Sequence, residues 1–285
     1  MYEKILVGFD DSQHSKAALI EAANWIKKHG SKLILVHAVF FDSEEFGIAP
    51  EQLEKRMKAG EKVCVQTKAM LTSEFGIEVQ SLLREGEPPA VIVDIAKEEK
   101  ADLIMLGTYG RKGLKRLLMG SVTSQVIVNS SIDVLVVKKP CTECTGEYKS
   151  ILVPFDGSAS SQKALNLACR LSKTDNAELQ ILYVIPRYEE MVEFFKSSSI
   201  KKSLLLEAQK IISTAKGIAS ELGVSVKDEI QEGNAAEKIV ETSNKLNTDL
   251  IVMGSYGYSG VNKAIIGSTA ERVITNASCP ILVVR

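Results

Sequence analysis

Short apolar segments alternate with amphipathic segments along the whole chain. Lys4–Phe9 is almost entirely apolar, whereas Ser15–His29 repeats its apolar residues at helical spacing. Continuous apolar runs are typical of strands buried on both faces, and a repeat of three to four residues is typical of a helix. In the first half the pattern predicts strands at Lys4–Phe9, Lys32–Val39, Ile77–Leu83, Asp102–Leu106 and Val134–Lys138, and helices at Ser15–His29, Glu51–Phe75, Ala90–Lys100 and Ser121–Asn129.

The second half follows the same order of elements. A long helix is predicted within Ile200–Leu222, and Gly223 ends it. The predicted strands are Ser150–Phe155, Glu178–Ile185, Ser225–Gln231, Leu250–Met253 and Ile281–Val284.

The two halves also share motifs at matching positions. Gly107, Gly110 and Gly120-Ser121 return 147 residues later, at Gly254, Gly257 and Gly267-Ser268, and Asp10 at the end of the first strand returns 146 residues later as Asp156. Such spacing indicates a duplicated domain. We therefore expect domains at residues 1–139 and 149–285, joined by the polar linker Lys139–Tyr148.

The predicted fold class is α/β, with two repeated open five-stranded parallel-sheet sandwich domains. Apolar strands separated by helices indicate a parallel sheet covered on both faces. A ligand of such a sheet binds at the carboxyl ends of the strands, at the switch point. The loops after the first, second and fourth strands are therefore the candidate site in each half.

Composition narrows the classes of partner. The chain has 285 residues, 45% of them hydrophobic and 25% charged, and its net charge of −1 gives no global field for nucleic acid or anionic membrane. No export signal or membrane-length apolar run is visible, and five cysteines are too few for a disulfide scaffold. We expect a cytoplasmic protein. Cys141 and Cys144 form a CxxC in the linker, which favours an incidental or structural role over a redox or zinc role.

The glycine loop after the fourth strand has the composition of a phosphate cradle. Gly107 and Gly110 let the backbone approach a ligand, and Gly120-Ser121 opens a helix whose N–H groups suit phosphate. Thr123 adds a hydroxyl in the first half. Ser268 and Thr269 are the hydroxyls of the second half. The alternative is a pair of connecting turns, but the second copy favours the cradle.

Asp10 and Asp156 lie at the predicted switch point. A carboxylate beside a phosphate site suits ribose hydroxyls or a Mg²⁺ ion on the phosphates. The alternative is a helix N-cap, although Ser12 and Ser158 can serve as caps. The loop is neither a Walker A motif nor a Rossmann fingerprint, because the glycines follow the fourth strand instead of the first.

Both halves resemble universal stress protein domains of the ATP-binding (UspA) type. The resemblance rests on the pattern Gly-x2-Gly-x9-Gly-[Ser/Thr], on Ile151–Ser158 and on the closing Pro280–Val284. It implies an adenine nucleotide alpha hydrolase-like fold with ATP or AMP at the strand ends. It also implies pairing of the halves through their fifth strands as an intramolecular pseudo-dimer, with a homodimer and an unknown protein partner as further expectations.

The resemblance also assigns residues. It puts Asp10 and Asp156 beside the ribose, and the backbone near Ala38 and Val184 beside the adenine. The full set of expected nucleotide-binding residues is Gly8, Asp10, Ala38, Gly107, Gly110, Gly120, Ser121, Val122, Thr123, Pro154, Asp156, Val184, Gly254, Gly257, Gly267, Ser268 and Thr269.

The two expected sites differ. Gly8 and Ala38 replace a usual proline and valine, which the second half keeps as Pro154 and Val184. The first loop carries more basic residues, which favours ATP there and AMP or weaker binding in the second. These residues are Arg111, Lys112, Lys115 and Arg116, against Lys263 alone. The alternative is that they form a solvated face.

Three functions fit these observations. A nucleotide-binding stress-response regulator explains a duplicated cradle without a duplicated catalytic group. A slow ATPase or phosphotransferase would need a catalytic base that the sequence does not repeat. A scaffold that has lost nucleotide binding would have no reason to keep both sets of glycines.

Overall fold

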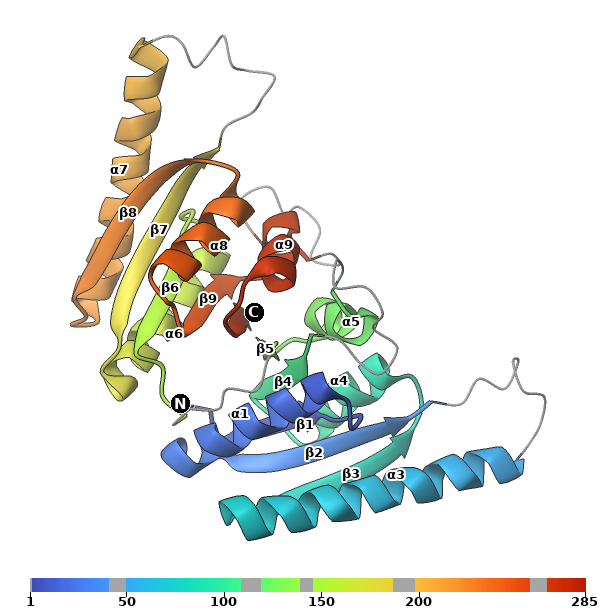
Figure 1. Ribbon diagram of the computed structural model, residues 1–285. Helices are drawn as coiled ribbons and strands as arrows, with labels where there is room; N and C mark the ends of the chain where they lie inside the picture. Colours follow the sequence, from blue (N-terminus) through green and yellow to red (C-terminus); the bar gives the residue numbers. More distant parts are fainter. Residues whose placement is uncertain (1, 41–49, 109–118, 139–145, 187–197, 257–265) are drawn as a thin grey trace. The chain divides into compact units, whose positions relative to one another are not determined.

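The computed structural model describes residues 2–40, 50–108, 119–138, 146–186, 198–256 and 266–285. The chain divides into two compact units, Met1–Glu147 (unit 1) and Tyr148–Arg285 (unit 2). Each unit alternates strands and helices (Figure 1).

Unit 1 contains a parallel sheet with the strand order β3-β2-β1-β4-β5. The strand order and right-handed crossovers place α1 and α3 on one face and α4 and α5 on the other. In agreement, α4 packs against α5, and α1 packs against η1, the π-helical turn that continues α3. The elements are β1 (Lys4–Gly8), α1 (Gln13–His29), β2 (Lys32–Val39), α3 (Pro50–Met70), η1 (Leu71–Phe75), β3 (Val79–Glu85), α4 (Pro88–Glu98), β4 (Leu103–Gly107), α5 (Ser121–Asn129) and β5 (Asp133–Val137).

Unit 2 repeats this arrangement with the strand order β8-β7-β6-β9-β10. Its helix α6 packs against α7, and α8 packs against α9. The elements are β6 (Ser150–Pro154), α6 (Ala159–Asp175), β7 (Glu178–Pro186), α7 (Ser198–Glu221), β8 (Val226–Gly233), α8 (Ala235–Lys245), β9 (Leu250–Gly254), α9 (Ser268–Asn276) and β10 (Ile281–Val284). The predicted α/β class with two five-stranded parallel sheets is confirmed.

Local sequence signals account for the helix ends. The Ser12 side chain caps α1 by accepting a hydrogen bond from the Ser15 N–H, and Ser158 caps α6 in the same way. Helix α1 therefore begins at Gln13, two residues before the expected start. Gly30 ends α1 with a φ of 76°, a left-handed conformation that glycine adopts without a steric cost.

The core of each unit lies along its central strands. Leu6 in β1 and Leu152 in β6 are completely buried. The sheet-edge strands β3 and β8 are mostly half-buried or exposed, because each pairs on one side only. Tyr148, which the sequence pattern assigns to the linker, is 3% exposed, and its N–H donates to Asp175 Oδ2. Tyr148 therefore packs as the first residue of unit 2.

Candidate functional site

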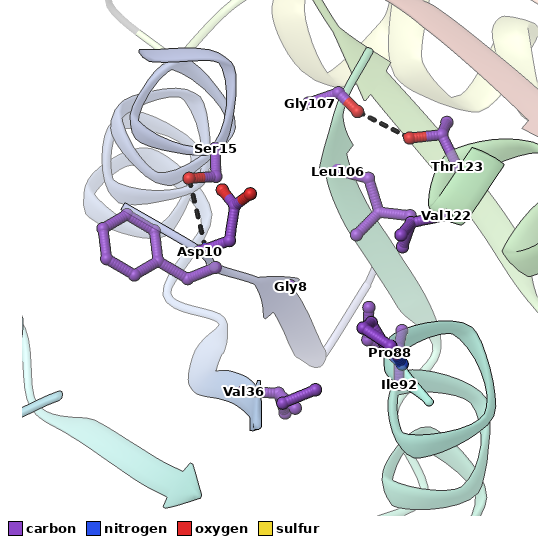
Figure 2. Close-up of a pocket in the computed structure, with 12 residues that line it drawn as sticks. Gly8, Asp10, Ser15, Val36, Pro88, Ile92, Leu106, Gly107, Val122 and Thr123 are labelled. Atoms are coloured by element: carbon purple, nitrogen blue, oxygen red, sulfur yellow. Dashed lines mark hydrogen bonds between the residues drawn. The ribbon is translucent and has the colours of Figure 1, made fainter. Parts of the chain in front are cut away.

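A cavity of about 110 Å³ lies at the carboxyl ends of the strands of unit 1 (Figure 2). It opens between β1 and β4, which is the switch point of the sheet. Residues from β1, β2 and β4 meet the first turns of α1, α4 and α5 there. The lining residues are Gly8, Phe9, Asp10, Ser15, Val36, Ala38, Pro88, Ile92, Leu106, Gly107, Val122 and Thr123.

The lining divides into an apolar part and a polar part. The β2 residues Val36 and Ala38 and the α4 residue Ile92 belong to the apolar part, and Figure 2 shows Leu106 and Val122 pointing towards each other. The polar side chains are those of Asp10, Ser15 and Thr123. A ligand with a flat apolar ring and a hydroxylated or charged portion fits such a division.

Asp10 is held by a turn at the start of α1. Its Oδ1 accepts a hydrogen bond from the Ser12 N–H at 3.1 Å. Its own N–H donates to Ser15 Oγ at 3.3 Å, and that hydroxyl donates to the Ser12 carbonyl at 3.1 Å. The turn fixes the half-buried Asp10 carboxylate at the cavity edge.

Unit 2 builds the same turn from the same residue types. Asp156 Oδ1 accepts from the Ser158 N–H at 2.9 Å, and Ser161 Oγ donates to the Ser158 carbonyl at 3.0 Å. Sequence reasoning singled out the aspartates and the caps but missed Ser15 and Ser161. The signal was available, because Asp-x-Ser-x-x-Ser occurs at both positions.

The start of α5 is anchored to the end of β4. The Gly120 N–H donates to the Thr108 carbonyl at 2.9 Å, and in unit 2 the Gly267 N–H donates to the Ser255 carbonyl at 3.1 Å. Ser121 and Ser268 are exposed at the first helical positions. Helix α5 therefore begins beside the cavity, because its residues Val122 and Thr123 line it, and the first N–H groups of a helix have no partner within the helix.

Thr123 has a role within the fold. It is 3% exposed, and its hydroxyl donates to the Gly107 carbonyl at 2.6 Å (Figure 2). This bond ties the third residue of α5 to the last residue of β4. In unit 2 the corresponding residue is Ala270, which cannot make this bond.

Gly107 and Gly254 also have a packing role. A Cβ atom at Gly107 would lie 2.5 Å from the backbone carbon and oxygen of His14, in the first turn of α1. At Gly254 it would collide with Ser160 in α6. The repeated glycine therefore lets the first helix of each unit approach the end of the fourth strand.

Residues expected at the adenine end of unit 2 lie at the ends of β6 and β7. Pro154 is the last residue of β6, and Val184 is half-buried in β7. Next to Val184, burial raises the pKa of the Tyr183 hydroxyl, and the negative charges of Glu207 and Asp156 raise it further. Tyr183 therefore stays protonated at neutral pH. It lies close enough to Asp156 for the charge of that carboxylate to affect the pKa of its hydroxyl.

Several expectations fall outside the described residues. They concern Gly110, Gly257, Cys141, Cys144 and the basic residues of both glycine loops, which are Arg111, Lys112, Lys115, Arg116 and Lys263. In the part of the chain that the structure describes, no cluster of three His, Cys, Asp or Glu side chains could hold a metal ion. None of the helices described there has both the length and the hydropathy to span a membrane.

The comparisons with known proteins agree on one family. The model of the universal stress protein family matches residues 1–138 and again 147–285. A universal stress protein of Methanocaldococcus jannaschii is 40% identical over 141 residues, which is 48% of this chain and 82% of the relative. One from Mycolicibacterium smegmatis is 24% identical over 99% of this chain and 96% of its own length.

A solved structure of similar fold spans almost the whole length of the chain. The crystal structure of a universal stress protein from Archaeoglobus fulgidus covers 99% of this chain and 98% of its own, with a TM-score of 0.76. Its sequence identity of 22% supports likeness of fold alone.

Proposed function

Because the chain belongs to the universal stress protein family, as two tandem domains, we propose that each unit binds an adenine nucleotide, ATP or AMP, and that the protein acts as a cytoplasmic stress-response regulator. The observation that carries the proposal is the divided cavity at the switch point of unit 1. Its apolar part suits a purine ring, and Asp10 at the polar part suits ribose hydroxyls. The start of α5 supplies N–H groups for phosphates.

The same cavity favours binding over catalysis. Among the twelve described residues that line it, Asp10 has the only carboxyl, imidazole, amine or thiol group. The Asp10 carboxylate already accepts the Ser12 N–H, which suits a positioning role better than that of a catalytic base. Bound nucleotide would bring its own Mg²⁺ on the phosphates, with Asp10 as a nearby carboxylate.

The nucleotide content of freshly purified protein tests the proposal directly. Denaturation and chromatography should release adenine nucleotide, and titration of the emptied protein should show two sites per chain. Protein that carries no nucleotide and binds neither ATP nor AMP would contradict the proposal. Hydrolysis during the titration would instead favour the slow ATPase.

Gly120→Val localises the binding to unit 1. Gly120 has φ −59° and ψ 139°, a conformation open to any residue, so valine introduces a branched side chain without straining the backbone. We expect the variant to lose one of two bound nucleotides, because the new methyl groups block approach to the α5 N–H groups. Gly120→Ala is the control for size. Two nucleotides bound with unchanged affinity by Gly120→Val would exclude the cradle at α5.

A further inference from the structure

The two units differ in the length of the hydrogen-bonded ladder between their central strands. In unit 1 the β1–β4 ladder continues to the pair Val7↔Met105. In unit 2 the β6–β9 ladder ends one step earlier, at Leu152↔Ile251. The missing pair would need an N–H from Pro154, which proline lacks, whereas Gly8 at the matching position keeps its N–H.

Side chains close over Gly8 in unit 1. A Cβ atom at Gly8 would lie 2.5 Å from Leu106 Cδ2 and 2.8 Å from Ile92 Cδ1, distances that real Cβ atoms do not show. Both side chains line the cavity and are nearly fully buried. Pro154 carries a Cβ and a ring at this position, and the sequence counterparts of Leu106 and Ile92 in unit 2 are Met253 and Ile239.

The replacements at two strand ends both favour binding of a base in unit 2 over unit 1. At the end of the first strand, unit 2 carries the apolar ring of Pro154 where unit 1 has Gly8, which has no side chain. In addition, β7 of unit 2 carries Val184 where β2 of unit 1 carries Ala38. This replacement adds about two carbons of apolar contact. The proline ring and the larger side chain of Val184 offer a bound base more apolar contact in unit 2 than in unit 1.

We infer that unit 2 is the nucleoside-selective site, which holds adenosine by base and ribose, whereas unit 1 depends on the phosphates of its ligand. This inference rests on the proposed function. Two buried carbons contribute about 1.6 kcal/mol, so adenosine should bind unit 2 at least about tenfold more tightly than unit 1. ATP should bind both units.

Isoleucine methyl NMR of the full chain separates the two sites. Ile92 lies in the cavity of unit 1, and Ile239 is its counterpart in unit 2. Titration with adenosine should shift the Ile239 signal at concentrations about tenfold below those that shift Ile92. Titration with ATP should shift both. Equal adenosine affinities would overturn the inference and leave the proposed function intact, whereas no response to ATP would remove both.

Pro154→Gly tests the cause. Glycine restores the N–H of the ladder and removes the ring, so we expect adenosine affinity at unit 2 to fall towards that of unit 1. The reverse change, Gly8→Pro with Leu106→Met, installs the unit 2 pair in unit 1 and should raise adenosine affinity there. The unchanged unit is an internal control in each case. Ile92 reports unit 1 in Pro154→Gly, and Ile239 reports unit 2 in the Gly8→Pro variant. Unchanged adenosine affinity at unit 2 in folded Pro154→Gly would contradict the inference.

Discussion

At the scale of single residues, Asp11 occupies a conformation that most side chains avoid. Its φ is 64°, and its counterpart in unit 2 is Gly157, with a φ of 84°. Aspartate tolerates the left-handed region better than most residues, and a β-branched residue tolerates it worst. Asp11→Val should therefore lower the free energy of unfolding by about 1 to 2 kcal/mol, measured by urea denaturation.

Two further substitutions show whether the backbone is the cause. Asp11→Gly copies the unit 2 residue and should leave the free energy of unfolding within about 0.5 kcal/mol of the parent. Glycine adopts the positive φ without a steric cost, but it also increases the conformational entropy of the unfolded chain. Lys16→Met removes the exposed ion pair with Asp11, 2.9 Å long, and should cost less than about 1 kcal/mol. Equal losses for Asp11→Val and Lys16→Met would point to the ion pair instead of the backbone.

The sequence revealed the residues at the strand ends but not all of their contacts. Asp10 could be placed at the switch point because a strand pattern stops there. Ser15 was missed although the Asp-x-Ser-x-x-Ser pattern is repeated, because the pattern alone does not show that the Ser15 hydroxyl accepts the Asp10 N–H in the capped turn. The nucleotide-binding roles of all these residues stay predictions.

At the scale of elements, the approach of α1 to the end of β4 depends on Gly107. Gly107→Ala would bring Cβ to 2.5 Å from the His14 backbone, which cannot rotate away as a side chain tip can. We expect a loss of about 1 to 3 kcal/mol in the free energy of unfolding, typical of overpacking. Thermal and urea denaturation followed by circular dichroism would measure it.

Gly217→Ala is the matched control. Gly217 lies in α7, and nothing lies within 4 Å of a Cβ atom placed there. Alanine favours a helix interior over glycine, so this variant should gain about 0.5 to 1 kcal/mol. A gain for Gly107→Ala as well would show that α1 can shift without cost and that the close contact does not constrain the fold.

The elements themselves were largely predictable because apolar periodicity and glycine signal their lengths. Gly76 was correctly expected to end the long helix, and its φ is 67°. The π-helical turn Leu71–Phe75 was not expected, because the residues of that turn continue a helical pattern. The exposure of β3 was also missed, since the position of a strand at the sheet edge follows from the order of strands and not from its own residues.

At the scale of the whole molecule, each unit has its own core, so we expect the units to unfold separately. Leu6 and Leu152 occupy matching places in β1 and β6, and both are fully buried. Truncation of either to alanine should cost about 2 to 5 kcal/mol, and even the lower value raises the opened population of that unit about 30-fold.

One buried thiol in each unit can report the opening of that unit. Cys64 lies in unit 1 and Cys169 in unit 2, where burial raises the pKa of the Cys169 thiol to about 11 despite the opposing charge of Lys173. At neutral pH this thiol stays protonated and enclosed, so a thiol reagent reacts with it only after opening. Leu152→Ala should accelerate labelling of Cys169 and leave Cys64 unchanged, and Leu6→Ala should do the reverse. Acceleration at both cysteines in both variants would show that the two units open as one, in which case a ligand bound to one unit would stabilise the other as well.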